Sequence, residues 1–421
     1  MNFKSDCLRF PGLLLCAALG LAGCGGGDAS TTPPANAVPA APTPTPTPTP
    51  ITPAPVIPVV PVAPVVPVIT GQGELRSATA LASVSVVDVI QAVNAPGAKA
   101  PPITPRYGVM SYRLNYFTVD GAGKQVLASG LVAVPIKGAG ATSPVLSYQH
   151  GTIFRDAQAP SNAVLPTEPP IVMASLGYIV VAADYVGYGV SKGAQHPYLL
   201  SAPAAAVVMD LLTAAKTWRR VNNMADNGQL FLAGYSEGGY VTMAAHRAMQ
   251  AAAGTHTPLM AVPGAGPYHV GVTLDELLKR VKSESPILGA LISPGLLRNL
   301  GSSVRNEVRR QLFKQLVPED SDVSFQSTFI DNYLADDDAA IERVSNVHDW
   351  KPDVPVRMFH GRDDQTVPYP VATRTLQAML ARGASTATLS DCTATPSSHQ
   401  GCVLPYWSFM LGNFSGLARD L

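Results

Sequence analysis

Residues 229–251 read QLFLAGYSEGGYVTMAAHRAMQA, and this stretch decides the fold. The apolar run Leu230–Ala233 predicts a short buried strand, and the alanine-rich segment that ends the stretch predicts a helix. Between them, GYSEG (234–238) matches the pattern G-x-S-x-G, in which a strand turns sharply into a helix and presents a serine at the turn. Strand and helix cross so closely there that a Cβ on either glycine would collide. We therefore expect a strained backbone at Ser236, with its Oγ lifted above the sheet edge as the candidate nucleophile.

A second match, GVSKG (189–193), shows that the pattern alone is weak. With 36 glycines in the chain, chance gives on the order of 0.2 matches, so the surroundings must decide. Ser191 lies several residues beyond its predicted strand, and Pro197 disfavours a helix directly after it. Ser236 has a strand before it and a helix directly after it. The sequence therefore predicts that Ser191 is a loop serine and Ser236 the nucleophile.

The N-terminus has the features of a signal peptide. Two basic residues precede the apolar stretch Phe10–Ala22, which is short for a membrane span. The stretch ends in LAGC (21–24), which resembles a bacterial lipobox and predicts cleavage after residue 23, with Cys24 as the lipidated N-terminus. An ordinary signal peptide is the alternative. Because Gly25 rather than aspartate follows the cysteine, we expect a lipid anchor in the cell envelope, at the outer membrane.

Residues 24–72 contain the expected lipidated N-terminus and a tether rich in Pro and Thr, which favours an extended, polyproline-like spacer. At roughly 3.1 Å per residue, the extended tether could hold the catalytic domain more than about 100 Å from its anchor. Residues 73–421 are enough for one α/β domain that carries an inserted helical cap. The net charge is zero and 14% of residues are charged, so the composition gives no sign of a nucleic-acid partner.

The five cysteines divide cleanly. Cys7 and Cys16 leave with the signal peptide, and Cys24 is the expected lipid site. Cys392 and Cys402 remain as an even pair outside the cytoplasm, where a disulfide is expected. It would close a loop of about ten residues and contribute about 2–3 kcal/mol.

The pattern of predicted strands and helices indicates the fold class. Tyr107–Val119 and Gln125–Val134 alternate as two antiparallel strands joined by a glycine-rich turn. Strands and helices then alternate, with strands at Pro144–Gln149, Tyr178–Asp184, Leu259–Ala265, Val354–Phe359 and Ala387–Ser390, and helices at Glu168–Leu176, Ala202–Arg219, Val371–Arg382 and from about Pro405. This order predicts an α/β fold with a mostly parallel central sheet and helices on both faces.

An insertion at about 267–350, here called the cap, interrupts this alternation. It falls between the sixth and seventh predicted strands, where a lid would cover Ser236. Three helices are expected in it, at Leu274–Val281, Val304–Leu316 and Asp331–Arg343. Several apolar positions suit either substrate binding or packing inside a small helical subdomain: Leu288, Leu291, Ile292, Leu296 and Leu297.

A nucleophilic serine needs a histidine base, and the histidine needs a carboxylate that orients it. In a fold with this kind of serine turn, the chain order is serine, acid, histidine. His399 alone among the eight histidines lies beyond the last predicted sheet strand, so it is the expected base. Four of the others are interpreted as packing or surface residues: His246, His256, His348 and His360.

Two aspartates compete for the role of the acid in HGRDDQTVP (360–368). The common form of this loop, H-G-x-x-D-x-x-V-P, selects Asp364, and Asp363 is expected to bond within the turn. Cys392 and Cys402 bracket His399 in a loop rich in Ser and Thr. A disulfide would restrict that loop and hold the imidazole over Ser236.

The oxyanion of an acyl-transfer intermediate needs hydrogen-bond donors. The backbone N–H of Glu237, at the positive end of the new helix, is the first candidate. The second should come from the loop after the strand Pro144–Gln149, and the N–H of Thr152 is expected because Gly151 lets the chain approach. A side-chain role for His150 is the alternative.

Taken together, residues 107–419 resemble a bacterial α/β-hydrolase of the secretory-lipase (LIP) type. The resemblance rests on YQHGT (148–152), DYVGYGVS (184–191) with HPYL (196–199), GYSEGG (234–239), GAGPY (264–268) and the acid loop. It implies the α/β-hydrolase fold and carboxylic-ester hydrolysis without a cofactor. Fungal lipases of the group tend to carry an acidic residue where this chain has His150, so the resemblance is closer to the bacterial esterase-like members.

We therefore predict a serine esterase or lipase that acts on a small-molecule or lipid ester through an acyl-enzyme. A serine peptidase or an acyltransferase on the same scaffold is the alternative, with Glu237 or Asp336–Asp338 as carboxylates for a substrate amine. A non-catalytic, surface-tethered binding protein is a further alternative, but it would not need Ser236, Asp364 and His399 together. No metal is expected, since neither HExxH nor paired CxxC occurs. The sequence does not give the oligomeric state.

Overall fold

The computed structural model describes residues 70–284, 292 and 297–421, except residue 99. The chain divides into two units, Met1–Ala63 and Pro64–Leu421, and all described residues belong to the second. The predicted signal peptide, Cys24 and nearly all of the tether lie outside the described residues, as do Leu288, Leu291 and Leu296.

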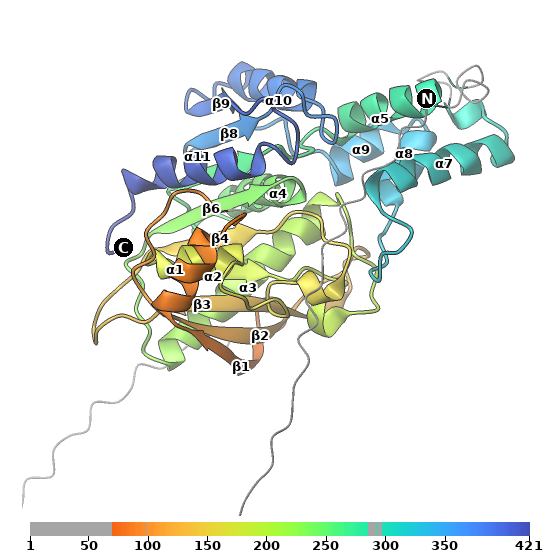
Figure 1. The fold of residues 1–421 in the computed structure, drawn as a ribbon. Helices are drawn as coiled ribbons and strands as arrows, with labels where there is room; N and C mark the ends of the chain where they lie inside the picture. The colour runs from red at the N-terminus through yellow and green to blue at the C-terminus, as the bar shows by residue number, and fades with distance from the viewer. Residues whose placement is uncertain (1–69, 99, 285–291, 293–296) are drawn as a thin grey trace, which may run out of the picture. The chain divides into compact units, whose positions relative to one another are not determined.

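A nine-stranded sheet forms the centre of the described unit (Figure 1). Its order is β1-β2-β3-β5-β4-β6-β7-β8-β9. The strands are β1 (Leu75–Val84), β2 (Val109–Val119), β3 (Gln125–Pro135), β4 (Val145–Gln149), β5 (Ile179–Ala183), β6 (Leu230–Tyr235), β7 (Met260–Gly264), β8 (Val356–His360) and β9 (Ala387–Asp391).

The first strands are antiparallel and the others parallel. β1 pairs with β2, β2 with β3 and β3 with β5 in antiparallel register, whereas β5, β4, β6, β7, β8 and β9 run parallel. In the parallel part Gln149 pairs with Gly234, and Gly264 with Phe359. The carboxyl ends of the strands therefore meet at one edge of the sheet, where α/β proteins place their sites.

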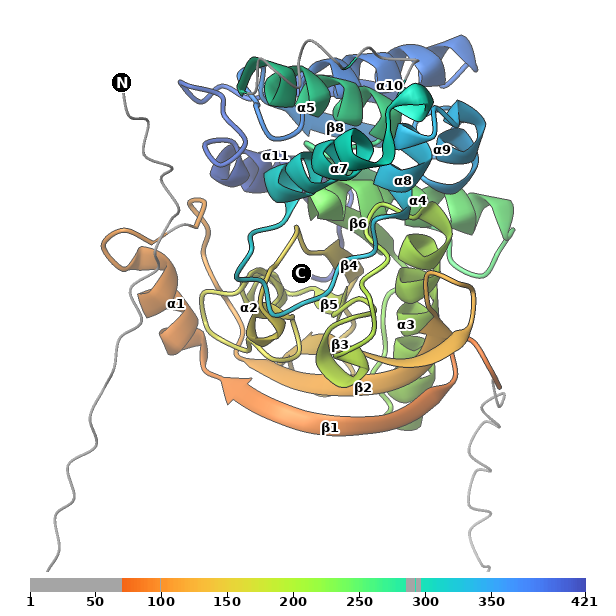
Figure 2. The same cartoon turned by 90° about the vertical axis from the view of Figure 1, so that its right-hand side faces the viewer.

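Helices cover both faces of the sheet, as Figures 1 and 2 show. One face packs against α1 (Val86–Asn94), α2 (Pro169–Ser175) and α11 (Val403–Ser415). The other packs against α3 (Ser201–Val221), α4 (Glu237–Ala251) and α10 (Pro370–Ala381). The parallel strands are buried on both faces, and for that reason they read as continuous apolar runs. The predicted fold class, a mostly parallel sheet between two helical layers, is confirmed.

The structure adds one strand and one helix that the sequence did not predict. Strand β1 consists mainly of small and polar residues, and most of them are exposed, so it lacks a buried alternating face. Its backbone pairing with β2 holds it at the sheet edge. Helix α1 follows directly. It is capped by Ser85, whose side chain accepts from the N–H of Asp88.

Among the described residues of the cap, four helices lie between β7 and β8 and pack against one another. They are α5 (Val270–Glu284), α7 (Ser302–Leu316), α8 (Thr328–Leu334) and α9 (Asp338–Val344). The predicted helix Asp331–Arg343 is wrong as a single element. Asp336 adopts a positive φ of 51° that ends α8, and the side chain of Asp337 caps α9.

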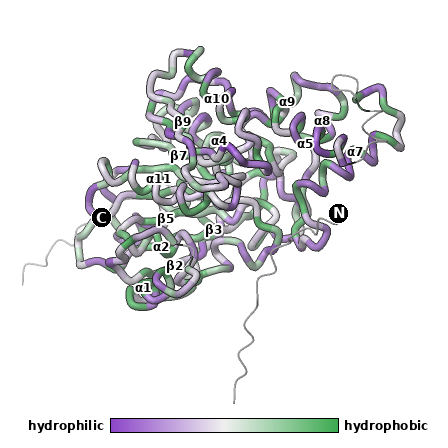
Figure 3. Tube along the Cα trace, turned by 45° about the horizontal axis from the view of Figure 1, so that its top comes forward, coloured by the Kyte–Doolittle hydropathy of each residue, from purple (hydrophilic) through white to green (hydrophobic). Residues whose placement is uncertain are grey.

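Hydropathy also varies along the described unit (Figure 3). Hydrophobic colour dominates many of the central strands, whereas hydrophilic segments are frequent on the cap helices. Ile292 and Leu297 are both buried in the core that the cap shares with α3 and α4, so these two apolar positions serve packing. Among the described residues, no helix combines the length and the apolar character needed to cross a membrane.

Candidate active site

The turn from β6 to α4 presents Ser236 in a strained conformation. Its φ is 61° and its ψ is −126°, a backbone region that non-glycine residues rarely occupy. The Ser236 N–H donates to the Gly264 carbonyl at 2.9 Å, which ties the turn to the end of β7. The neighbouring strand thus helps to hold the strain that lifts the side chain above the sheet edge.

The two glycines of the motif are required by close backbone contacts. A Cβ on Gly234 would lie 2.3 Å from the Gly238 carbonyl oxygen, so strand and helix do approach as expected. A Cβ on Gly238 would lie 2.0 Å from the carbonyl oxygen of Gln149, at the end of β4. The second glycine therefore makes room for a neighbouring strand rather than for β6.

The structure brings Ser236, His399 and Asp364 into one hydrogen-bonded chain. His399 Nε2 lies 2.8 Å from Ser236 Oγ, and His399 Nδ1 lies 2.6 Å from Asp364 Oδ2. His399 and Asp364 are both buried. In this geometry the imidazole can take the serine proton at Nε2 while its Nδ1–H stays bonded to the carboxylate.

The carboxylate of Asp364 is held in its ionised form by its neighbours. Its Oδ1 accepts from the N–H groups of Thr366 at 2.8 Å and Val367 at 2.9 Å. Burial raises the pKa of Asp364, but the hydrogen bonds and the electrostatic attraction from His360 and His399 outweigh burial and bring the pKa well below its ordinary value. His360 Nε2 lies 3.3 Å from Asp364 Oδ2 and 2.8 Å from the Val367 carbonyl, so this histidine supports the acid loop.

Asp363 has a different role from the one expected. The carboxylate does not bond within its own turn. Its Oδ2 accepts from the N–H and the Oγ–H of Ser397, each at 2.9 Å, while the Asp363 N–H donates to Ser397 Oγ at 3.1 Å. Because Ser397 stands two residues before His399, Asp363 joins the acid loop to the histidine loop.

Two further contacts hold the histidine loop. The sulfur atoms of Cys392 and Cys402 lie 2.14 Å apart and their Cα atoms 5.9 Å apart, which fits the predicted disulfide. Tyr235, the residue before the nucleophile, donates its hydroxyl to the His399 carbonyl at 2.8 Å. His399 is thus positioned by contacts at the start of α11, with the acid loop and with the turn that carries Ser236.

Both residues predicted to supply the oxyanion donors belong to segments that lie beside Ser236. Glu237 is the first residue of α4, so its N–H has no acceptor within the helix. A Cβ on Gly151 would lie 3.6 Å from Ser236 Cβ and 3.2 Å from the Tyr235 carbonyl oxygen, so the chain before Thr152 runs along the nucleophile turn. His150 is buried and stacks on Tyr185, and burial lowers its pKa.

Sequence reasoning missed a buried pair directly behind the nucleophile. Glu237 Oε1 lies 2.6 Å from His196 Nε2, with both side chains almost fully buried. The carboxylate that was considered for binding a substrate amine is therefore occupied. Two of the cap carboxylates considered with it are also engaged, since Asp336 accepts from the Arg298 N–H and Asp337 from the Ala340 N–H.

The serine and the histidines that were predicted to have no catalytic role make structural contacts. Ser191 donates to the Tyr188 carbonyl at 2.8 Å and accepts from the Gly187 N–H, inside a short helical turn. His246 packs edge-on against Trp350, His256 lies 2.9 Å from Thr213 Oγ1, and His348 stacks on His269.

A cavity of about 340 Å³ contains Ser236 and His399. The cap contributes Thr273, Gln315 and Leu316 to its wall. Most of the other lining residues are apolar or aromatic: Tyr148, Phe154, Pro169, Tyr198, Leu199, Tyr235, Pro267, Val367, Val403 and Trp407. Among the described residues that line it, none carries an Asp, Glu, Lys or Arg side chain.

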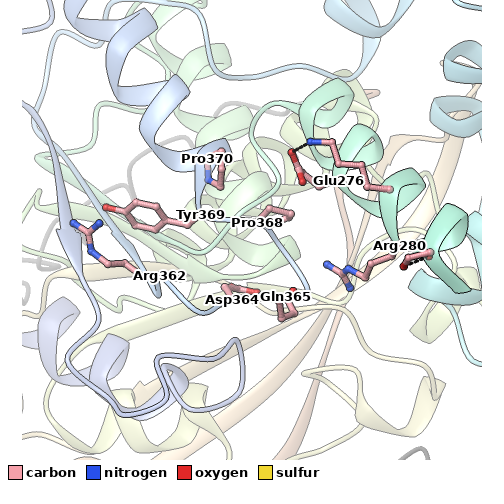
Figure 4. Close-up of a pocket in the computed structure, with 10 residues that line it drawn as sticks. Glu276, Arg280, Arg362, Asp364, Gln365, Pro368, Tyr369 and Pro370 are labelled. Carbon is pink, nitrogen blue, oxygen red and sulfur yellow. Dashed lines mark hydrogen bonds and ion pairs between the residues drawn. The ribbon is translucent and has the colours of Figure 1, made fainter. Parts of the chain in front are cut away.

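A second cavity, of about 380 Å³, lies on the other side of the acid loop, against α5. Its wall is charged, and Figure 4 shows Arg280 extending from α5 toward Gln365. Glu276 pairs with Lys279 at 2.6 Å, and Arg362 pairs with Asp391 at 2.6 Å. Neither Ser236 nor His399 lines this cavity, so the apolar one is the candidate substrate site.

Comparison with known proteins places the chain in a class. The structure is similar to a protein from Legionella pneumophila (TM-score 0.64, 22% identity, 81% of this chain and 97% of that chain). It is also similar to the rice cell wall degrading esterase LipA from Xanthomonas oryzae (TM-score 0.60, 23% identity, 82% and 98%) and to lipase A from Candida antarctica (TM-score 0.54, 16% identity, 83% and 84%). No curated protein matches the chain.

Fold and site together define a serine hydrolase with the α/β-hydrolase fold. Residues 172–392 match the family described as serine aminopeptidase S33, and the chain belongs to this family. The match begins in α2 and ends after β9, so it spans the nucleophile turn, the cap and the acid loop.

Proposed function

We propose that the protein is a carboxylic-ester hydrolase in which Ser236, His399 and Asp364 are the nucleophile, base and orienting acid. The observation that carries this proposal is the continuous chain of hydrogen bonds, at 2.8 and 2.6 Å, whose Ser236 and His399 line an apolar cavity. A binding protein on an inactive scaffold would not require the strained serine backbone.

The reaction follows from these positions as two acyl transfers. His399 Nε2 takes the proton of Ser236 as its Oγ attacks the ester carbonyl, and the N–H groups of Glu237 and Thr152 bind the oxyanion. The imidazolium then protonates the leaving alcohol, which leaves an acyl group on Ser236. Water, deprotonated by His399, attacks the acyl-enzyme and releases the acid. Asp364 keeps the Nδ1–H tautomer throughout.

The lining of the cavity favours an ester with an apolar acyl or alcohol group. An aminopeptidase needs a carboxylate that faces the α-ammonium group of its substrate, and the described lining residues offer none. Glu237, the carboxylate nearest in sequence to the nucleophile, is bound to His196. The family name keeps an aminopeptidase as the second candidate.

The two candidates are separated by two series of substrates whose leaving groups, p-nitrophenol and p-nitroaniline, are each followed by absorbance. Purified protein is assayed on p-nitrophenyl esters with acyl chains from C2 to C16 and on aminoacyl p-nitroanilides, with Ser236→Ala as the blank. We expect ester turnover that disappears in Ser236→Ala and no comparable anilide turnover. A higher kcat/KM on the anilides would assign the protein to the peptidases.

We further propose that residues 1–23 are a lipoprotein signal peptide, that Cys24 carries the lipid, and that residues 24–72 tether a catalytic domain of residues 73–421 to the outer membrane. The support is the sequence LAGC (21–24) and the Pro/Thr-rich stretch after it. Cys24→Ser should move the protein out of the membrane fraction, and mass spectrometry should find diacylglycerol on Cys24 of the native protein. Retention of Cys24→Ser in membranes would contradict the anchor.

A further inference from the structure

The buried pair of Glu237 and His196 has a fixed proton count. His196 Nδ1 lies 2.9 Å from the Val186 carbonyl, which can only accept, so Nδ1 carries a hydrogen. The 2.6 Å contact between Nε2 and Glu237 Oε1 needs one further hydrogen, because two lone pairs would repel each other. That proton belongs to either atom, as imidazolium and carboxylate or as imidazole and carboxylic acid. In both cases the pair is electrically neutral.

Apart from His196, no described residue donates a hydrogen bond to the Glu237 carboxylate. Its second oxygen, Oε2, is buried and has no hydrogen-bond partner among the described residues. By contrast, the buried carboxylate of Asp184 accepts from Ser129 and twice from Ser161. A lone carboxylate at Glu237 would therefore be both unpaired and desolvated, which is costly in a buried site.

The groups that face the pair cannot neutralise a carboxylate. The titratable side chains around Glu237 are His150, Tyr185, Tyr188, Tyr198 and Tyr240. Burial raises the pKa of each tyrosine and lowers the pKa of His150, so all five are uncharged near neutral pH. His196 is the one described partner that can hold the proton for Glu237.

His196 is itself fixed in place by the cap. Its N–H donates to the Ser324 carbonyl at 2.7 Å, and its carbonyl accepts from the Gln326 N–H at 2.8 Å. Its ring lies parallel to Tyr185 and meets Phe325 edge-on. The pair therefore links the first residue of α4, which follows the nucleophile, to the cap segment 324–326.

We propose that Glu237 and His196 are positioning residues that share one proton, hold the start of α4, and leave no net negative charge beside the oxyanion at Ser236. This inference rests on the proposed function, since it is the oxyanion of acyl transfer that a nearby carboxylate would disfavour. At an effective dielectric constant of about 20, the repulsion between two like charges several ångströms apart would lower kcat by about 10- to 100-fold.

The test removes one half of the pair and then restores neutrality. In His196→Asn the amide nitrogen takes the place of Nδ1 and can keep the bond to Val186, while Nε2 is deleted. We expect kcat on a p-nitrophenyl ester to fall about 10- to 100-fold and to fall further as pH rises and the lone carboxyl ionises. The double variant His196→Asn/Glu237→Gln should recover most of the loss in kcat and lose the added pH dependence. His246→Asn, which removes a buried imidazole elsewhere on α4, is the matched control and should leave the shape of the pH profile unaltered.

Equal pH profiles for the single and the double variant would overturn the proposal, because loss of packing alone would then explain the defect. If His196→Asn fails to fold by circular dichroism, ¹⁵N-histidine NMR of the unaltered protein decides the matter. A hydrogen that stays on Nδ1 of His196 from pH 6 to 9 and a strongly deshielded proton shared between Nε2 and the Glu237 carboxyl group are expected, and the absence of a hydrogen on Nδ1 or of the shared proton would refute the pair. Full activity of Ser236→Ala would instead overturn the proposed function and leave the NMR result intact.

Discussion

Asp363 and Ser397 hold the acid loop and the histidine loop together through three hydrogen bonds of 2.9 to 3.1 Å. The two neighbouring aspartates of the acid loop therefore have different roles. Asp364 bonds to the imidazole itself, and Asp363 bonds to the segment that carries the imidazole.

This division predicts unequal effects of two matched substitutions. Asp364→Asn should lower kcat about 10³- to 10⁴-fold, because an amide no longer fixes the productive tautomer of His399. Asp363→Asn keeps an acceptor oxygen for Ser397 and should cost less than about tenfold, with a loss of about 1 kcal/mol in the free energy of unfolding. Steady-state kinetics on one ester and urea unfolding measure both. The reverse ranking would assign the orienting role to Asp363.

The bridge between Cys392 and Cys402 should matter more for activity than for stability. It closes a short loop, which gives only about 2–3 kcal/mol, but that loop carries His399. The double variant Cys392→Ser/Cys402→Ser should lose about 10- to 100-fold in kcat at temperatures where circular dichroism still shows the fold. Simultaneous loss of ellipticity and activity would make the bridge a simple structural link. Two free thiols in the native, unreduced protein would show that it does not form.

Buried histidines should make the fold less stable in acid. Burial lowers the pKa of His246 to about 4, whereas an unfolded chain gives about 6.5. Between these values the unfolded state binds the extra proton, so the stability due to the neutral ring is full above about pH 6.5 and is lost as pH falls toward 4. His246→Phe should reduce the difference in the free energy of unfolding between pH 7 and pH 5 by about 1–2 kcal/mol. An unchanged difference would show that the pKa of His246 is the same in the folded and the unfolded protein.

Much of the fold could be predicted because its parallel strands are buried on both faces and read as apolar runs. The same reasoning failed for β1, since its side chains are mostly exposed and only backbone pairing with β2 defines it. Sequence reasoning also predicted α8 and α9 as one helix. The left-handed turn at Asp336 that separates them is formed by a charged residue, which would be equally ordinary within a helix.

The site divides in a similar way. Ser236 and Asp364 stand in motifs whose spacing fixes their register, whereas His399 is identified by its position after the last predicted strand. The structure brings these three residues together. The pairing of Glu237 with His196 spans 41 positions and joins two motifs that each look complete alone. No periodicity or spacing signals that contact, so it emerges only from the packed structure.

Covalent labelling with a fluorophosphonate probe tests the central claim, that Ser236 is the nucleophile. The probe reacts with a serine only where a base and an oxyanion site activate its hydroxyl. After digestion and mass spectrometry, we expect the phosphonate on the peptide that contains Ser236, labelling at the wild-type rate in Ser191→Ala, and none in Ser236→Ala. Labelling that persists in Ser236→Ala, on Ser191 or elsewhere, would contradict the account.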